Sequence, residues 1–425
     1  MDMLLEKLLS NRILLRVLNI GIRGGTVLGR FVLIMFLAKF LPEADVGKFG
    51  IFVATVLFCV LLVSFDFNKY MYGELFAQGE GARARILGSH FKTVVCLYLV
   101  SIPFFYLIFF GGFIEFDYIV YFYLTLFFVM VSLELEALLV VLGNQLLSSF
   151  VFFTQTSAWV FFVVPVVYFF PAYRSLEFIY LSWLGGAGLS ILIALCFLKA
   201  NNIRVDFNGM GGAWVRSGLK KSVIFLLSSI MLKLLLTVDR YVMEYYSTPE
   251  LVGVYVFYIS VVMGVFNFLD PAVFSFIYPK LLRSYKEGNH AAYAAAHKEL
   301  ICSTAIGVVV LALFIGYLVP YIIEVLSLHA YEKNLDSLWL VIFAAAVFKL
   351  GFIPHYVLYS RGMFNWLSYS NAASLVAFLL SAYCLSMQST ISLLASCLLI
   401  AFSVGGAVKL YAAYGLRDGQ VHNVQ

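Results

Sequence analysis

The side chains most able to do chemistry in this chain lie inside its apolar stretches, and three of them interrupt the stretch 226–253. Lys233, Thr237 and Arg240 are spaced so that they share one face of a helix. A helix of about 20 residues spans the hydrocarbon of a bilayer, so Lys233 is expected near the midplane. A lysine there costs about 2.5–3.5 kcal/mol and usually faces a cavity or a partner. We predict a polar stripe; the alternative is that Lys233 pairs with Asp239 or a carbonyl group and Arg240 reaches the interface.

A second pair of cations lies in the first apolar stretch of the chain. Arg23 and Arg30 fall within about 20° of each other on a helix of about 100° per residue. Gly21, Gly25 and Gly29 occupy the opposite face, where small residues let another helix approach closely. Guanidinium groups recognise phosphate and carboxylate through forked hydrogen bonds. We predict that one face packs while the other presents both cations to an anionic ligand; snorkelling to the interface is the alternative and is hardest for Arg30.

The further candidates among the charges in apolar stretches are one lysine and four carboxylates. Lys349 is predicted to be a further cation near the midplane. Asp66 and Asp270 end the second and eighth apolar stretches and are candidates for gating. Asp239, beside an arginine, is a candidate for an outer latch, and Glu134 is a candidate proton carrier. Static ion pairs or helix-end residues are the alternative interpretation of all four carboxylates.

Composition shows which elements must position these side chains. The chain has 425 residues, of which 63% are hydrophobic and only 12% are charged. This balance excludes an ordinary soluble globule and indicates a multi-pass membrane protein. The apolar runs lack the alternation of barrel strands, so the fold class is all-α.

Twelve apolar runs are long enough to span a bilayer. They lie at 18–41, 46–66, 93–113, 118–142, 148–170, 177–198, 222–246, 251–277, 301–324, 336–358, 365–386 and 391–414. With both termini cytoplasmic, nineteen basic residues lie inside and three, Lys48, Arg174 and Lys333, lie outside. The nineteen are Lys7, Arg12, Arg16, Lys69, Arg83, Arg85, Lys92, Lys199, Arg204, Arg216, Lys220, Lys221, Lys280, Arg283, Lys286, Lys298, Arg361, Lys409 and Arg417. Because basic residues concentrate in cytoplasmic loops, this orientation is predicted.

A local repeat divides the chain into halves. The hairpin 41–47, LPEADVG, is matched by TPELVG at 248–253, and each lies at the same place in a group of six spans. Because six is even, the halves are expected to be parallel repeats related by a pseudo-two-fold axis along the membrane normal. We predict an N-terminal bundle at 1–198 with a short interfacial helix at its start, a cytoplasmic linker at 199–221, and a C-terminal bundle at 222–425.

Several kinds of chemistry lack their sequence signals. The sequence contains no GxxxxGK[ST] loop and no HExxH motif, and its six cysteines show no metal spacing. The outward loops are too short for a catalytic domain. We therefore expect no metal, no cofactor and no enzyme activity, and the net charge of +5 suits anionic lipid rather than nucleic acid.

At this point the sequence resembles a known group. The resemblance rests on three passages: RGG…GR leading to LPEADVGKFG, the passage KLLLTVDRYVMEYYSTPELVGVY, and VFSFIYPKLLRSYKEGN at the end of the eighth span. These loose patterns, with twelve spans in two halves, resemble the polysaccharide-exporter branch of the multidrug/oligosaccharidyl-lipid/polysaccharide (MOP) superfamily, and more narrowly bacterial Wzx-type O-antigen flippases. The resemblance covers essentially the whole chain.

The resemblance implies a fold and a function. It implies two six-helix bundles in a V around a central cavity, in the bacterial inner membrane. It also implies movement of undecaprenyl-pyrophosphate-linked oligosaccharide, for O-antigen or a related surface polysaccharide, from the cytoplasmic to the periplasmic leaflet. A polysaccharide polymerase and chain-length machinery would be partners, and an H⁺ or Na⁺ gradient would be a candidate driving force. Arg23, Arg30, Lys233, Arg240 and Lys349 would then line the lumen.

Other functions would require different features in the sequence. A multidrug or cation antiporter of the toxic-compound-extrusion branch should carry carboxylates, rather than cations, in the first and seventh spans. A flippase for peptidoglycan lipid precursors is expected to have two further C-terminal spans. A membrane enzyme would need a catalytic loop, and a passive scaffold would not need intramembrane charge.

Overall fold

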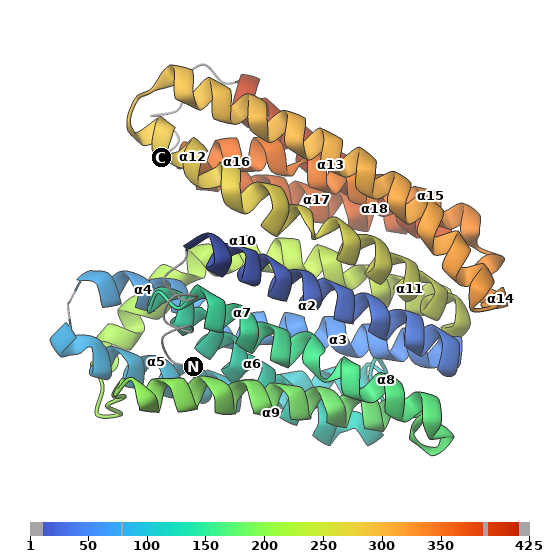
Figure 1. Ribbon diagram of the computed structural model, residues 1–425, viewed down its shortest axis with the longest axis horizontal. Helices are drawn as coiled ribbons and strands as arrows, with labels where there is room; N and C mark the ends of the chain where they lie inside the picture. Colours follow the sequence, from blue (N-terminus) through green and yellow to red (C-terminus); the bar gives the residue numbers. More distant parts are fainter. Residues whose placement is uncertain (1–11, 78–79, 386–389, 416–425) are drawn as a thin grey trace. The chain divides into compact units, whose positions relative to one another are not determined.

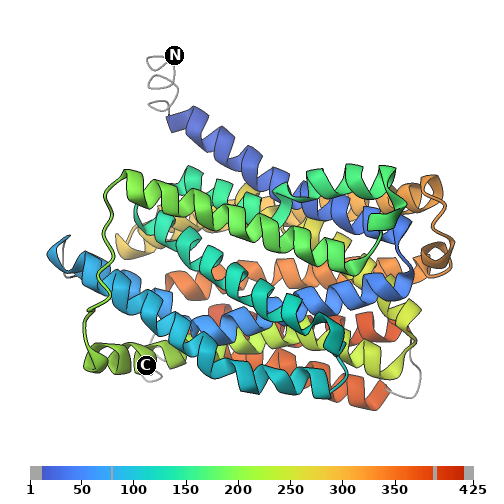
Figure 2. The same cartoon turned by 90° about the horizontal axis from the view of Figure 1, so that it is seen from below.

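A computed structural model describes residues 12–77, 80–385 and 390–415, and the regular structure in these ranges is entirely helical (Figures 1 and 2). Eleven of these helices are long and apolar enough to cross a membrane, and a bent pair, Gly212–Val223 and Leu226–Tyr246, makes a twelfth if it counts as one span. Such helices satisfy their backbone groups internally, as hydrocarbon requires. The predicted all-α membrane fold with about twelve spans is therefore confirmed.

The first of two compact units comprises Met1–Leu33 and Ile51–Ile230. Its elements are the first part of α2 (Arg12–Phe40), most of α3 (Glu43–Ser64), α4 (Phe67–Ala77), α5 (Glu80–Phe110), η1 (Phe116–Tyr118), α6 (Ile119–Val141), α7 (Gln145–Phe153), η2 (Thr154–Ala158), α8 (Val160–Phe169), η3 (Pro171–Tyr173), α9 (Leu176–Ala200) and the first part of α10 (Gly212–Tyr246). Within this unit α6 packs along α9, which also contacts α7 and η2.

The second unit comprises Ile34–Gly50 and Met231–Gln425. It holds the ends of α2 and α10 and the start of α3, followed by α11 (Pro249–Phe266), η4 (Asp270–Phe274), α12 (Ser275–Lys286), α13 (His290–Val325), α14 (His329–Glu332), α15 (Leu335–Leu350), α16 (Phe352–Ser360), α17 (Phe364–Leu385), α18 (Ile391–Leu410) and η5 (Tyr411–Gly415). Here α18 contacts both α15 and α17, and α13 contacts α12 and α15.

The helices extend beyond the predicted spans mainly at three ends. The third span begins at Gly81 rather than 93, the eighth ends at Lys286 rather than 277, and the ninth begins at His290 rather than 301. Hydropathy detects only the apolar part of a helix, whereas backbone hydrogen bonding continues into polar sequence. At its start, α13 is capped by Asn289, whose side chain accepts a hydrogen bond from the Ala292 amide.

The segment predicted as a linker is partly helical. Figure 2 shows residues 201–211 crossing from the end of α9 to the start of α10. The residues that follow form the first part of α10, which bends by 52° between Val223 and Leu226 (Figure 1). The predicted division into bundles at 1–198 and 222–425 stays a prediction, and most of the predicted N-terminal interfacial helix lies outside the described residues.

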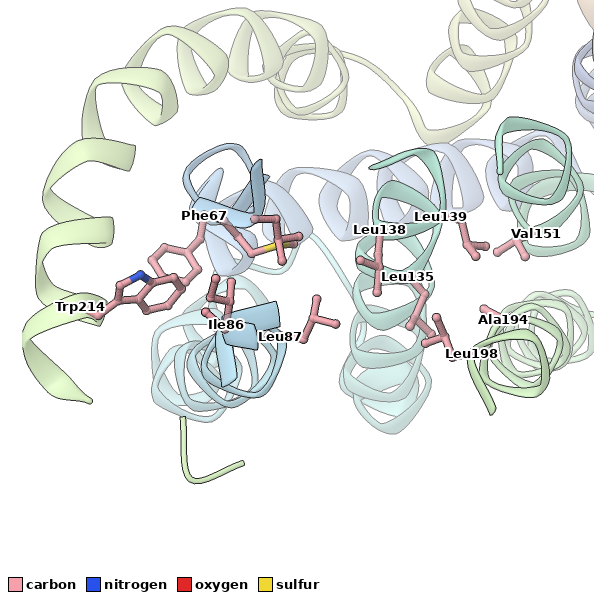
Figure 3. Close-up of a cluster of buried hydrophobic side chains, with 13 residues drawn as sticks. Phe67, Ile86, Leu87, Leu135, Leu138, Leu139, Val151, Ala194, Leu198 and Trp214 are labelled. Atoms are coloured by element: carbon pink, nitrogen blue, oxygen red, sulfur yellow. The ribbon is translucent and has the colours of Figure 1, made fainter. Parts of the chain in front are cut away.

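A buried apolar cluster holds this first part of α10 on the first unit (Figure 3). The cluster joins α4, the start of α5, the later parts of α6 and α9, and Trp214 of α10. The ring of Trp214 stands edge-on to Phe67, with centroids 5.6 Å apart and planes at 86°. Ile86 and Leu87 are fully buried in the same cluster. Aromatic edge contacts and apolar burial therefore fix the position of residues 212–223.

Candidate functional site

In the second unit, α10 carries a buried acid beside a half-buried arginine. Arg240 Nη1 donates to Asp239 Oδ1 at 3.0 Å and to the Leu236 carbonyl at 2.9 Å. The Tyr255 hydroxyl of α11 donates to Asp239 Oδ2 at 2.6 Å. Arg240 Nε is buried and has no hydrogen-bond partner among the described residues. The predicted contact between Asp239 and Arg240 is therefore present.

A second ion pair in this unit joins a predicted cation to a predicted gating residue. Lys349 Nζ of α15 donates to the two Asp270 oxygens at 3.1 and 3.2 Å. Lys349 is almost fully buried, whereas the Asp270 side chain is 47% exposed. The ammonium also lies 5.0 Å from the centre of the Phe352 ring. Asp270 opens the π-helix η4, with Pro271 next to it. Lys349 is therefore already paired inside the protein.

The two arginines of α2 contact neutral side chains of α7 in the first unit. Arg23 Nε donates to Ser149 Oγ of α7 at 3.0 Å. The Arg30 guanidinium lies 5.6 Å from the centre of the Phe152 ring. Both arginine side chains are exposed. Neither forms an ion pair in the described part of the chain, although Arg23 is close enough to Glu136 of α6 for their charges to interact.

The glycines of α2 allow the predicted close approach at two positions. A Cβ on Gly29 would lie 2.7 Å from Ser157 Cβ, and one on Gly25 would lie 3.4 Å from the Phe153 ring. Ser157 Oγ donates to the Thr26 carbonyl at 2.7 Å. Gly21 meets nothing within 4 Å. The packing function of the pattern is therefore confirmed for its last two glycines.

The predicted ligand-binding cations divide between the units. Arg23 and Arg30 belong to the first, and Lys233, Arg240 and Lys349 to the second. Lys233 is half-buried, and its carbonyl accepts a hydrogen bond from the buried Thr237 at 2.8 Å. Their common role in binding substrate stays a prediction.

Asp66 lies in a break between two helices. Phe65 and Asp66 adopt positive φ angles of 54° and 49°, which end α3 and let α4 begin in a new direction. Asp66 Oδ2 accepts hydrogen bonds from Lys69 at 2.8 Å and from Ser229 of α10 at 2.7 Å. The carboxylate therefore joins the helix break to α10, and its role in gating stays a prediction.

Glu134 has a partner that the sequence did not indicate. Its Oε2 lies 2.9 Å from His90 Nε2 of α5, and both side chains are buried. Glu136 instead accepts a hydrogen bond from Ser148 of α7 at 2.8 Å, so the two acids face different helices, as their spacing predicts. Burial, and then the charges of Glu134 and Glu136, raise the pKa of Tyr72 in α4. The hydroxyl of Tyr72 therefore stays neutral.

Comparisons with known proteins place this geometry in a fold. No family model and no curated protein matches the chain. Solved structures do match. A multidrug resistance MATE family transporter of the MOP superfamily, in an inward-facing conformation, aligns with a TM-score of 0.73 and 10% identity, over 96% of this chain and 99% of that one. The lipid II flippase MurJ aligns with a TM-score of 0.67 and 11% identity, over 96% and 89%.

A third structure, a MOP superfamily transporter from Pyrococcus furiosus, aligns with a TM-score of 0.64 and 12% identity, over 96% and 95%. The chain has the fold of MOP superfamily transporters. The MOP-transporter fold and the many membrane-capable helices make this a multi-pass membrane protein. In the described ranges, no group of three or more His, Cys, Asp or Glu side chains could hold a metal ion.

This instance of the MOP-transporter fold also contains polar groups that sequence analysis missed. The π-helix η2 buries Thr154, Gln155, Thr156 and Ser157 between α7 and α8. The carbonyl oxygen of the Gln155 side chain has no hydrogen-bond partner among the described residues. Short π-helices inside α-helices often occur at functional sites. No local sequence signal predicts such a break, because the run 148–170 looks uniformly helical.

Proposed function

We propose that this protein is a flippase for a lipid-linked oligosaccharide. The substrate is an undecaprenyl-pyrophosphate-linked repeat unit of O-antigen or a related surface polysaccharide, moved from the cytoplasmic to the periplasmic leaflet. Transport proceeds by alternating access through a cationic lumen in the bacterial inner membrane, with both termini cytoplasmic. The orientation rests on nineteen basic residues inside against three outside.

The observation that carries the proposal is the excess of cations over acids in the first and seventh spans. The first span holds Arg23, Arg30 and Lys39 and no acid, and the seventh holds Lys233 and Arg240 against two acids, Asp239 and Glu244, so the two spans together carry five cations and two acids. Each intramembrane cation costs about 2.5–3.5 kcal/mol to insert, so several of them indicate an anionic ligand.

A pyrophosphate explains the choice of these side chains. It carries its negative charge on several oxygens, and guanidinium groups contact such oxygens through two donors at once. Arg240 has one guanidinium donor, Nε, without a hydrogen-bond partner among the described residues. A polar lumen would shield the phosphates and sugar hydroxyls from hydrocarbon while the polyprenyl tail stays in lipid.

Similarity of fold supports transport but does not select the substrate. The aligned proteins include a lipid II flippase, named for a lipid-linked substrate, and a multidrug resistance transporter. Peptidoglycan precursor transport and drug or cation antiport are therefore the competing functions. The predominance of cations in the first and seventh spans favours an anionic substrate over a cationic drug. A polysaccharide polymerase and chain-length machinery would act on the delivered product.

Lys233 provides the test. Lys233→Ala should lower flipping of a lipid-linked oligosaccharide at least tenfold in proteoliposomes, whereas Lys233→Arg should retain most activity, because charge matters before geometry at a delocalised anion. Lys298→Ala, which removes an exposed lysine of α13, is the matched control and should flip normally. Normal flipping by Lys233→Ala at normal insertion would contradict a role for this cation.

A second assay separates the competing functions. The gene should restore surface glycan in a bacterial strain that lacks its own oligosaccharide flippase. Wild-type vesicles should not extrude a cationic dye such as ethidium. Dye extrusion without glycan restoration would replace the flippase proposal with cation antiport, and restoration of peptidoglycan precursor transport alone would replace the substrate.

A further inference from the structure

A cavity of about 500 Å³ lies in the first unit, between the start of α5, the segment 201–211 and the first part of α10. Its polar lining includes Ser89, Lys92 and Arg216, and its apolar lining includes Leu97, Val100 and Leu219. None of the cations or carboxylates assigned above to transport lines it. The cavity is thus a second site, separate from those residues.

Close backbone contacts shape one wall of the cavity. The Asp206 amide donates to the Ala84 carbonyl at 2.9 Å, and the Met210 amide donates to Ser89 Oγ at 2.6 Å. A Cβ on Gly88 would lie 1.9 Å from the Asp206 carbonyl oxygen, so only glycine permits this approach. The segment 201–211 is therefore held against α5 without a ligand.

The opposite wall is held equally firmly. Trp214 packs in the apolar cluster of Figure 3, and its Nε1 donates to Glu74 at 3.3 Å. A Cβ on Gly218 would lie 2.5 Å from the rings of Phe67 and Tyr70, which shows how closely this helix approaches α4. The first part of α10, which bears Arg216, is thus fixed against the bundle, and the cavity is preformed.

The charge in the cavity lining is wholly positive. Lys92 and Arg216 line it, and no acidic residue does. Both side chains are exposed, and neither forms an ion pair in the described ranges. Gly211 and Gly212 also line it, where α10 begins, so the positive end of the helix dipole adds to the two cations. The lining therefore favours an anion.

The apolar side of the cavity continues along the outer face of α5. Val100 lines the cavity and is 63% exposed, and Phe104 and Leu107, spaced by four and three residues, are 66% and 65% exposed. These positions share one helical face. In a membrane-spanning helix this exposed face meets acyl chains. The cationic part of the cavity and the apolar track thus meet at Val100.

We propose that this cavity binds an anionic glycerophospholipid. Its phosphate headgroup lies against Lys92 and Arg216, and one acyl chain follows Val100, Phe104 and Leu107 along α5. A soluble anion would not need the apolar track, and a neutral lipid would not need two unpaired cations, so the combination selects a charged lipid. By occupying the cavity, the lipid would hold the first part of α10 against α5.

Native mass spectrometry of the purified protein tests the site. Wild-type protein should retain phosphatidylglycerol in preference to phosphatidylcholine, and added salt should weaken the preference. Lys92→Gln/Arg216→Gln should lower phosphatidylglycerol binding roughly 30-fold, since each cation near an anionic lipid contributes about fivefold. The matched control, Arg83→Gln/Arg85→Gln, removes two cations of α5 outside the lining and should bind normally.

A variant that keeps both cations tests the acyl track. Val100→Trp should obstruct the track and also reduce phosphatidylglycerol binding, with the folded state of each variant checked by its unfolding temperature. Equal binding of the two lipids, or full binding by Lys92→Gln/Arg216→Gln, would overturn the proposal. Displacement of the lipid by inorganic phosphate would identify a soluble-anion site instead. The readout is binding, so it is independent of the transported substrate.

Discussion

Gly47 and Gly253, from the two matching hairpin sequences, lie against each other in the second unit. A Cβ on Gly47 would stand 3.1 Å from the Gly253 amide nitrogen, and one on Gly253 would stand 1.8 Å from the Glu43 carbonyl oxygen. The starts of α3 and α11 therefore meet backbone to backbone. Equivalent positions of a repeat meet in this way near a pseudo-two-fold axis, which supports the duplicated architecture.

Gly253→Ala should destabilise the protein. The added methyl group overlaps a backbone carbonyl, which cannot move aside as a flexible side chain can, so we expect a loss of about 1–3 kcal/mol. Gly264→Ala in the same helix is the control, because nothing lies within 4 Å of its Cβ. Thermal unfolding in detergent measures both. Equal unfolding temperatures for the two variants would contradict the close contact.

Because Asp270 and Lys349 form an ion pair, substitutions of the two residues should have non-additive effects on the stability of the protein. Asp270→Asn leaves the buried Lys349 without a charged partner and should cost about 1–3 kcal/mol, less than a fully buried pair because Asp270 is half exposed. Lys349→Met/Asp270→Asn should recover most of this loss, since an apolar side chain replaces the orphaned charge. Denaturant unfolding of both single variants and the double variant gives the coupling. Additive losses would show that the residues act independently.

The topology can be read from single cysteines in a chain whose six native cysteines are replaced. Cysteines at Asn208 and Asn289 should react with an impermeant maleimide only from the cytoplasm, and one at Thr248 only from the periplasm. All three positions are exposed. Asn208 is preferable to its neighbour Gly209, whose φ of 70° would strain a cysteine. Labelling of Thr248 from the cytoplasm would reverse the proposed orientation.

We propose that Asp239 couples an ion gradient to transport, because protonation would cancel its charge beside Arg240. In proteoliposomes, an imposed pH or Na⁺ gradient should accelerate flipping by the wild type. Asp239→Asn should abolish this response while retaining binding of the lipid-linked glycan. Tyr255→Phe, which removes only the hydrogen bond to Asp239, should keep the response. A wild-type rate indifferent to every gradient would leave product removal as the driving force.

The spans were predictable because their signal is local. About 20 consecutive apolar residues identify a membrane helix whatever the rest of the chain does. Spacing also predicted that Glu134 and Glu136 do not share a face, as the structure confirms. It predicted close packing at Gly21, Gly25 and Gly29, which the structure confirms for the last two. The chemistry of single side chains and the geometry of one helix were sufficient for these predictions.

The residues that pair with each charged side chain could be found only from the tertiary structure, because they depend on how helices distant in the sequence pack. The sequence presents Lys349 as a lone cation, yet Asp270, 79 residues away, neutralises it. Glu134 contacts His90, 44 residues away in the sequence, and no pattern in the sequence predicts this pair. The cavity beside α5 likewise exists only because residues 201–211 fold back onto α5. Hydropathy indicates the free-energy cost of placing a charge in the membrane. Whether a partner or a ligand offsets that cost depends on how the helices pack.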